Sequence, residues 1–159
     1  MASSSFSTVR PARPDDAREL LSMMKALADF EGYLEQFRVT VDALLERGLD
    51  GQAEPQFFAA VAEVDDVLCG YAVCVDTHFT VDLCPTAVLK ELYVEPAYRG
   101  LGIAQALFDF VRQEASARGA ARLQWLVLPW NVRAQRFYRR QGGREDLSWQ
   151  RWAVDLKSL

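Results

Sequence analysis

The residues best suited to chemistry lie in a glycine-containing turn in the second half of the chain. Arg99, Gly100, Gly102 and Ala104 follow an apolar, β-branched run that Pro96 brings to an end. They precede a segment whose apolar residues recur at helical spacing, so a strand, a loop and a helix are expected in that order. Glycines let a backbone approach a ligand closely, and the first N–H groups of a helix lack internal partners and favour negative charge. The junction therefore predicts a binding site for a phosphate group.

Two common phosphate loops are excluded by the residues around these glycines. No Lys-Ser or Lys-Thr pair follows them, as a nucleoside-triphosphate loop requires. Gln105 stands where a dinucleotide-binding fingerprint needs its third small residue. The remaining pattern is Arg99-x-x-Gly102-x-Ala104, in which the guanidinium would add a charge-assisted hydrogen bond to the anion. The alternative is a plain glycine turn into a helix.

A second group of residues with chemical potential opens a later helix. The segment reads Trp130-Asn131-x-x-Ala134-x-x-Phe137-Tyr138. Asn131 stands at the helix start, where its side chain can cap the helix or reach a ligand. Tyr138 follows two turns later on the same helical face, and a phenol within reach of a leaving group can protonate it. The alternative is a buried, hydrogen-bonded structural tyrosine.

The elements that must position these residues follow from hydrophobic periodicity and from turn signals. Strands are expected at 6–12, 57–64, 68–75 with a continuation over 77–81, 87–94, 122–128 (fully buried) and 148–156 (a closing strand). Helices are expected from Asp15 to near Gly32, from Thr40 to Gly48, from the glycine loop to Gly119, and over 131–141. The order β-α-α-β-β-β-α-β-α-β predicts an α/β (α+β) fold with a mixed, mostly antiparallel sheet and helices on both faces.

Length and composition limit the class of protein. A chain of 159 residues, half of them hydrophobic, fits a single domain over residues 1–159. The first residues lack the basic and apolar regions of a signal peptide, and no apolar run approaches the roughly 20 residues that span a bilayer. We therefore expect a cytoplasmic protein without a membrane partner. Three cysteines without a C-x-x-C pair argue against a disulfide framework and against a metal site, and are expected to be buried.

Charge is distributed unevenly along the chain. Residues 15–66 contain 13 acidic against 4 basic side chains, whereas residues 99–159 contain 11 basic against 5 acidic ones. This asymmetry predicts a polyanion near the C-terminal half and a cation near the N-terminal half, where the acidic and aromatic segment 30–39 suits one wall of a cleft. The alternative is that both halves carry solvated faces. The net charge of −4 and the absence of a recognisable binding module exclude nucleic acid as an expected partner.

The two patterns, together with the Leu-Tyr-Val strand end before the first, resemble the signatures of the GNAT family of N-acetyltransferases. The resemblance implies the GNAT fold, in which the fourth strand and the next splay apart and the pantetheine arm of acetyl-CoA lies in the gap. It implies acetyl transfer from acetyl-CoA to a small primary amine, by direct attack in a ternary complex. It also implies a set of cofactor-binding residues: Leu92, Tyr93, Val94, Arg99, Gly100, Leu101, Gly102, Ile103, Ala104, Gln105, Asn131 and Ala134.

The same resemblance assigns the catalytic roles. Tyr138 would be the general acid that protonates the departing thiolate, and the backbone N–H of Val94 would polarise the acetyl carbonyl. Glu91 would be the base, because the acidic groups at this strand end face the acceptor amine in the family. Three alternatives stay open: ordered water as the base, His78 (the only histidine), or a Glu91 that faces solvent, since one residue of register decides its face.

A longer similarity is to the diamine (spermidine/spermine) and thialysine N-acetyltransferase branch. It is carried by Ala28-Asp29-Phe30-Glu31, Glu35-Gln36, Thr40, Leu44-Leu45, residues 57–64, Gly70-Tyr71-Ala72 and Tyr98-Arg99-Gly100. It implies that Glu31 and Glu35 line the amine side. Where the branch has Leu-Glu-Asp, this chain has Leu89-Lys90-Glu91. An ammonium repels a dicationic substrate, so we expect Lys90 to face the substrate and to favour a zwitterionic or carboxylate-bearing amine.

Other functions remain open within this resemblance. The protein could acetylate protein lysines or N-termini, or it could bind coenzyme A as a sensor without chemistry. A homodimer is expected from the resemblance and from the exposed edge that a closing strand with Trp149 and Trp152 would present. The sequence does not identify the acceptor amine.

Overall fold

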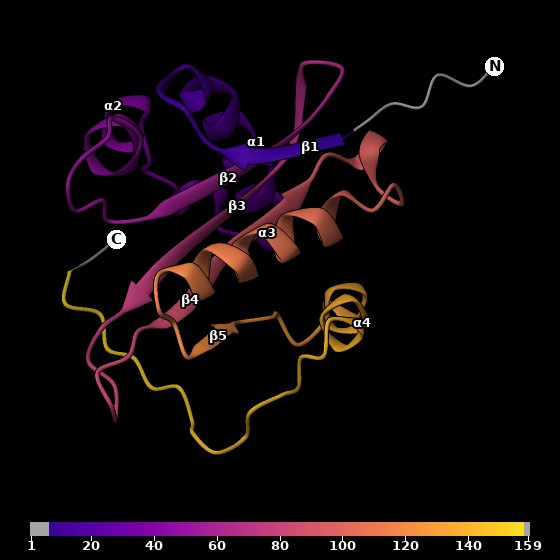
Figure 1. Ribbon diagram of the computed structural model, residues 1–159. Helices are drawn as coiled ribbons and strands as arrows, with labels where there is room; N and C mark the ends of the chain where they lie inside the picture. The colour runs from indigo at the N-terminus through magenta and orange to yellow at the C-terminus, as the bar shows by residue number, and fades with distance from the viewer. Residues whose placement is uncertain (1–6, 158–159) are drawn as a thin grey trace. The chain divides into compact units, whose positions relative to one another are not determined.

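The computed structural model describes residues 7–157 and divides after Leu126 into two compact units (Figure 1). The first unit contains the sheet and most helices, and the second contains α4 (Val132–Arg140) and the segment that follows it. The prediction of a single domain over residues 1–159 stays a prediction. Phe6, which the predicted first strand included, lies outside the described residues.

The first unit is built on a five-stranded mixed sheet in the order β1-β2-β3-β4-β5. The first four strands pair antiparallel, and β4 and β5 pair parallel, which confirms the predicted mixed α/β fold. The strands are β1 (Ser7–Pro11), β2 (Phe58–Val64), β3 (Val67–Thr77), β4 (Thr86–Val94) and β5 (Arg122–Trp125). The β2–β3 hairpin turns through Asp65 and Asp66 alone, as predicted, and both residues have positive φ, at 50° and 63°.

Two long helices cover opposite faces of this sheet: α1 (Ala17–Glu31) and α3 (Ile103–Ala117). The apolar stripe of α1 packs in one core with Val61 and Tyr71, while the next residues along these strands face α3. Gly70 belongs to the α3 face, where a Cβ would lie 3.2 Å from Leu107 Cδ1 and 2.8 Å from a backbone oxygen, so only glycine fits. Figure 1 shows α3 running along the sheet. The prediction of helices on both faces is confirmed.

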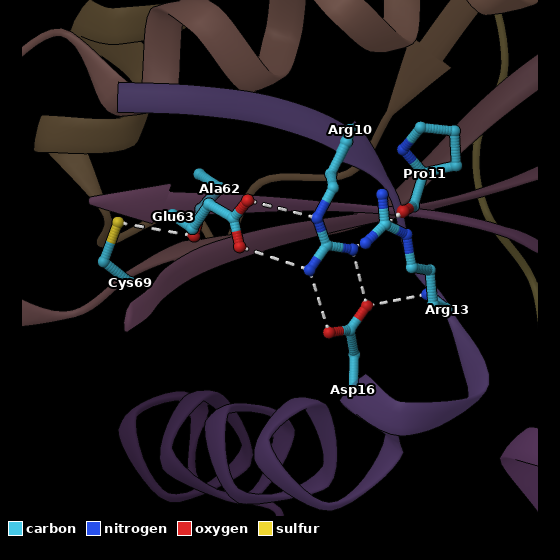
Figure 2. Close-up of polar contacts among 7 residues, drawn as sticks. All are labelled: Arg10, Pro11, Arg13, Asp16, Ala62, Glu63 and Cys69. Carbon is cyan, nitrogen blue, oxygen red and sulfur yellow. Dashed lines mark hydrogen bonds and ion pairs between the residues drawn. The ribbon is translucent and has the colours of Figure 1, made fainter. Parts of the chain in front are cut away.

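An arginine-centred ion pair network joins β1, β2 and the start of α1 (Figure 2). The guanidinium of Arg10 donates to both carboxylate oxygens of Asp16, at 2.8 and 3.0 Å, and to both of Glu63, at 3.3 and 3.2 Å. Asp16 also accepts the Arg13 backbone N–H at 2.7 Å. Burial disfavours the charged carboxylate, but these hydrogen bonds outweigh it and hold the pKa of Asp16 below its ordinary value. The network fixes the angle at which α1 leaves the sheet edge.

The helix predicted from Thr40 to Gly48 is present but differs in kind and in its end. It consists of α2 (Val41–Leu44), capped by Thr40 as expected, and a π-helical turn over Leu45–Leu49. Gly48 lies inside this turn and does not terminate it. A Cβ at this position would collide with the Phe57 ring. Close packing, rather than a left-handed cap, is therefore the reason for glycine here.

Three strand predictions are wrong in extent or existence. β3 ends at Thr77, so residues 78–81 do not extend it. β5 covers four residues and is not fully buried, because it is an edge strand with one covered face. On that face the ring of Trp125 packs edge-on against the ring of Phe108, with 5.5 Å between the ring centroids. In the described second unit, residues 148–156 form no strand, and the side chains of Trp149 and Trp152 are about nine-tenths exposed. Alternation shows which side chains can share a face but does not supply a partner edge.

Two further expectations can be compared with the structure. Cys69 and Cys74 are buried as expected, whereas Cys84 is exposed, because it lies in the loop between β3 and β4. All three thiols are free. Over residues 7–157, no helix has both the length and the apolar character needed to cross a bilayer.

Candidate active site

The predicted phosphate loop has an open, uncapped helix start. Gly100 and Gly102 have φ of +79° and +80°, which side chains rarely adopt, and a Cβ at either would meet no described atom within 4 Å. Gly102 is the N-cap of α3, and no side chain caps it. The first helical hydrogen bond runs from Ala106 to Gly102, so the three N–H groups before Ala106 point out of the helix. This geometry fits the pyrophosphate of coenzyme A.

Arg99 is anchored beside this loop. Its Nε donates to the carbonyl oxygen of Val94 at 2.9 Å, and its guanidinium carbon lies 5.9 Å from the centroid of the Tyr93 ring. In the described part of the chain, neither terminal amino group of this guanidinium has a hydrogen-bond partner. The side chain is thus held at one end and keeps two donor groups for an anion.

β4 is paired with β5 along its first half only. Their parallel ladder runs from Thr86 and Arg122 to Leu89 and Trp125, where β5 itself ends. Over the described residues, residues 91–94 of β4 are therefore paired with β3 alone, and one edge of this half is unpaired. The splay that the resemblance implied stays a prediction.

Backbone groups of alternate residues face this unpaired edge of β4. The N–H of Glu95 donates to the Cys69 carbonyl of β3 at 2.8 Å. In an antiparallel ladder the preceding residue then directs its N–H and C=O away from that partner strand, so those of Val94, and likewise of Leu92, point to the open edge. The Val94 carbonyl accepts from Arg99 there, whereas its N–H stays open to a ligand. Tyr93 is placed differently: its ring is buried and lies 6.0 Å from that of Tyr71.

Glu91 follows a β-bulge in β4 and faces α1. Val73 of β3 pairs with Glu91, but the next residue, Cys74, pairs with Leu89, so Lys90 is an extra residue in β4. Because Val73 belongs to the α1 face of the sheet, Glu91 lies on that face as well. Lys90 itself is exposed. Glu91 is therefore half-buried under α1 and is not the solvent-facing strand residue of the alternative reading.

Glu91 is held by a buried tyrosine of the neighbouring strand. The hydroxyl of Tyr71 donates to Oε2 of Glu91 at 2.8 Å. Tyr71 is part of the longer similarity to the diamine and thialysine branch but has no predicted role there. No local signal could have found this contact, because it depends on the pairing register of two strands.

The end of α1 brings two more polar groups to the same place. Gly32 ends the helix with φ +86°, and the N–H of Tyr33 donates back to the carbonyl of Ala28 at 2.9 Å. This Schellman-type turn keeps Glu31 and Tyr33 close to the sheet, where both interact electrostatically with Glu91. Burial, together with the two carboxylates, raises the pKa of Tyr33 to about 12.

The pKa of Glu91 lies above its ordinary value. Burial is the largest cause, and the negative charge of Glu31 acts in the same direction. The Tyr71 hydrogen bond and the ammonium of Lys90 oppose this rise. A half-buried carboxylate with a raised pKa is suited to general base work near neutral pH. Burial also raises the pKa of Glu31. The two carboxylates lie close enough to interact, and together they favour a cation.

Two other predicted residues are not brought into this cluster. Glu35 is exposed in the short turn Leu34–Gln36, where its backbone carbonyl accepts a hydrogen bond from Arg38. His78 is exposed in the loop after β3. Within residues 7–157, no group of three His, Cys, Asp or Glu side chains is arranged to hold a metal ion.

The second motif lies in the second unit, where Asn131 caps α4 and Ala134, Phe137 and Tyr138 lie within the helix. Oδ1 of Asn131 accepts the backbone N–H of Ala134 at 3.1 Å, so the side chain caps its own helix. Tyr138 is half-buried, with its ring edge-on to Phe137 at 5.2 Å. Gly142, with φ +83°, ends the helix as predicted. The cap uses the side-chain oxygen of Asn131 as the acceptor and gives the N–H of Ala134 a hydrogen-bond partner.

The sequence of this chain matches one known protein family. The family model described as "Acetyltransferase (GNAT) family" matches residues 20–143, and the chain belongs to this family. It is thus a GNAT N-acetyltransferase, and members of this family use acetyl-CoA.

Two relatives illustrate the range of similar sequences. Thialysine N-epsilon-acetyltransferase of Bos taurus is 28% identical over 149 residues, which cover 88% of this chain and 85% of that protein. Spermidine/spermine N(1)-acetyltransferase-like protein 1 of Homo sapiens is 29% identical over 153 residues, 91% of this chain but 21% of that protein.

Solved structures share the fold at lower identity. Aminoglycoside N-acetyltransferase AAC(6')-Iy in complex with CoA has a TM-score of 0.75 at 21% identity, over 100% of this chain and 99% of that chain. A ribosomal-protein-alanine N-acetyltransferase from Brucella melitensis biovar Abortus 2308 has a TM-score of 0.72 at 20% identity, over 95% and 100%. These likenesses confirm the GNAT fold.

Proposed function

We propose that this protein transfers the acetyl group of acetyl-CoA to a small primary amine, by direct attack of the amine within a ternary complex. The observation that carries this proposal is the pair of carboxylates formed by Glu91 of β4 and Glu31 at the end of α1. Glu91 has a raised pKa, faces α1 and lies on the strand that leads directly into the anion-binding loop. A base for an ammonium and a holder for a pyrophosphate thus share one strand end.

The cofactor part of the proposal rests on groups that fit coenzyme A. The N–H groups that open α3 and the guanidinium of Arg99 would hold the pyrophosphate. The open edge of β4, to which Leu92 and Val94 present backbone groups, would hold the pantetheine arm. Acetyl-CoA supplies an activated acyl group when it is bound.

Glu91 would act on the amine. Its carboxylate accepts a proton from the ammonium, and the neutral nitrogen then attacks the thioester carbonyl carbon while the Val94 N–H donates to the carbonyl oxygen. A C–N bond forms, the C–S bond breaks, the attacking nitrogen gives up its second proton, and the thiolate takes one up as it leaves as the thiol. Tyr138 stays the predicted donor of that proton, on the strength of its motif alone.

The acceptor is proposed to be an amine that also carries a carboxylate. Glu31 and Glu91 favour a cation, whereas Lys90, exposed at the bulge next to Glu91, offers a positive charge to an anionic group. A free amino acid with a side-chain amine has both charges. Thialysine, the acceptor in the names of the bovine, pig and mouse relatives, is of this kind. A homodimer and a cytoplasmic location stay predictions.

The test is a panel of amines scored by the release of free thiol from acetyl-CoA. It should include lysine and its analogues, ornithine, diamines, polyamines and a lysine-containing peptide. Turnover of an amino acid with a side-chain amine, reduced by at least about 100-fold in Glu91→Gln, would support the proposal. Acetylation of the peptide alone would indicate a protein acetyltransferase. Binding of acetyl-CoA by calorimetry without turnover of any amine would indicate a sensor.

A further inference from the structure

We propose that Tyr71 is a positioning residue of the acceptor site. Its hydroxyl donates a hydrogen bond to Oε2 of Glu91 and thereby leaves Oε1 to take the proton of the amine. The inference rests on the proposed function, because it presumes that Glu91 is the base. Neither the motifs nor the family resemblance points to this tyrosine as part of the site.

The geometry makes Tyr71 a rigid support. Its side chain is 0% exposed, and its ring lies 6.0 Å from the ring of Tyr93 on the neighbouring strand and within the α1 core. The hydroxyl reaches Oε2 of Glu91 at 2.8 Å, the normal length of a hydroxyl hydrogen bond. A close-packed ring cannot follow a moving carboxylate, so the carboxylate is held to the ring.

The direction of this hydrogen bond is fixed. Burial, followed by the charge of Glu91, raises the pKa of Tyr71 far above its ordinary value, so the phenol keeps its proton at every pH suitable for an assay. Tyr71 is therefore always the donor and Oε2 always the acceptor. Among residues 7–157, the carboxylate of Glu91 has no other hydrogen bond. A proton taken up by Glu91 consequently goes to Oε1.

Groups from four parts of the fold surround Glu91, and three of them shift its pKa. Glu31 at the end of α1 raises its pKa, whereas Tyr71 of β3 and Lys90 of β4 lower it. Tyr33, in the turn after α1, lies close enough for its own pKa to be raised by Glu91. Removal of the Tyr71 hydroxyl deletes one of the two influences that favour the carboxylate, so the pKa of Glu91 should rise.

The first measurement does not depend on turnover. The titration of Glu91 is followed by NMR in protein labelled with ¹³C at the glutamate carboxyls, with Glu91→Gln to assign the signal. In Tyr71→Phe the midpoint should move upward by about one pH unit, as expected for the loss of one hydrogen bond to a charged group. Tyr93→Phe is the matched control, because its hydroxyl lies on the same sheet face but donates to Glu95 at 3.2 Å. A Glu91 midpoint that is equal in all three proteins would overturn the inference.

The second measurement connects this shift to catalysis. With one amine used for both proteins, the acid limb of kcat/KM against pH should move upward by the same amount in Tyr71→Phe. A tyrosine that only supports the core would lower activity at every pH and leave the limb in place. A shifted NMR midpoint with an unmoved limb would show that Glu91 is not the base and would overturn the inference. If the wild-type protein acetylates no amine, the proposed function fails, and the NMR arm still decides whether Tyr71 controls Glu91.

A third variant guards against misfolding of Tyr71→Phe, which circular dichroism would reveal. Incorporation of 3-fluorotyrosine at position 71 preserves the shape of the ring and makes the hydroxyl a stronger donor. The Glu91 midpoint and the acid limb should then move downward, opposite to the change in the phenylalanine variant. A shift in the same upward direction would contradict the inference.

Discussion

Replacement of Asp16 by asparagine should reveal how strongly the arginine network stabilises the fold. Asp16 accepts three hydrogen bonds, two from Arg10 at 2.8 and 3.0 Å and one from the Arg13 N–H at 2.7 Å. In Asp16→Asn the amide keeps an acceptor oxygen but turns an NH2 group toward a guanidinium donor. The side chains of Arg10 and Asp16 are only 15% and 10% exposed, so solvent screens the pair weakly.

The expected loss lies between two limits. Breaking a fully buried ion pair costs about 3–5 kcal/mol, because the remaining charge is left without a partner. Here Glu63 continues to accept a hydrogen bond from Arg10 at 3.2 Å, so the guanidinium keeps one carboxylate partner. A single hydrogen bond to a charged group contributes about 1.5–3 kcal/mol, and we therefore expect a loss of about 2–3 kcal/mol in the free energy of unfolding. In a chain of this size that corresponds to a fall in Tm of about 5–10 °C.

The assay is urea unfolding followed by circular dichroism at pH 7 and at intervals down to pH 3. Asp15→Asn is the matched control, since Asp15 is the exposed neighbour of Asp16 and should change stability by less than about 0.5 kcal/mol. Glu63→Gln should fall between the two, because Glu63 is 24% exposed and its bonds to Arg10 are longer. Equal stability of Asp16→Asn and Asp15→Asn would refute the reasoning.

The pH dependence has a defined sign. The pKa of Asp16 is lower in the folded protein than its ordinary value of 3.8. Its contribution is therefore complete above that value and is lost as the pH falls through the lower, folded pKa. The wild-type protein should lose stability more steeply below pH 3.8 than Asp16→Asn does, and the two curves should converge there. Parallel curves across this window would exclude Asp16 as the cause.

Three further changes test the loop, the acceptor site and the hairpin. Gly102→Ala should weaken acetyl-CoA binding at least about tenfold by calorimetry, because a methyl group enters the space before the helix start. Gly119→Ala, at φ +86°, has a similar backbone cost of about 1–2 kcal/mol and should bind acetyl-CoA normally. Equal affinities of the two variants would contradict the loop assignment. Lys90→Glu should raise the ratio of kcat/KM for a diamine to kcat/KM for an amino acid. It should also move the acid limb of the pH profile of kcat/KM upward, since Lys90 lowers the pKa of Glu91. An unchanged ratio would show that Lys90 does not select the acceptor. Asp66→Gly should stabilise the fold by about 0.5–1 kcal/mol in urea, because φ is 63° at this turn position; no gain would show that the turn is unstrained.

The sequence by itself determined the features that depend on neighbouring residues. The glycine loop at 99–104, the capping of α4 by Asn131 and the two-residue hairpin turn are all encoded within a few positions of one another, and the structure contains each of them. The apolar stripes of α1 and α3 are similarly local, so their positions and ends could be predicted to within a few residues.

Only the tertiary structure decided which groups surround Glu91. Its partner Tyr71 comes from another strand, 20 residues away, and the pairing of Val73 with Glu91 brings the two side chains together. Pairing register is a property of two strands together, so no pattern within β4 contains this information. The closing strand predicted at 148–156 failed for the same reason: alternation is local, whereas a strand needs an edge with which to pair.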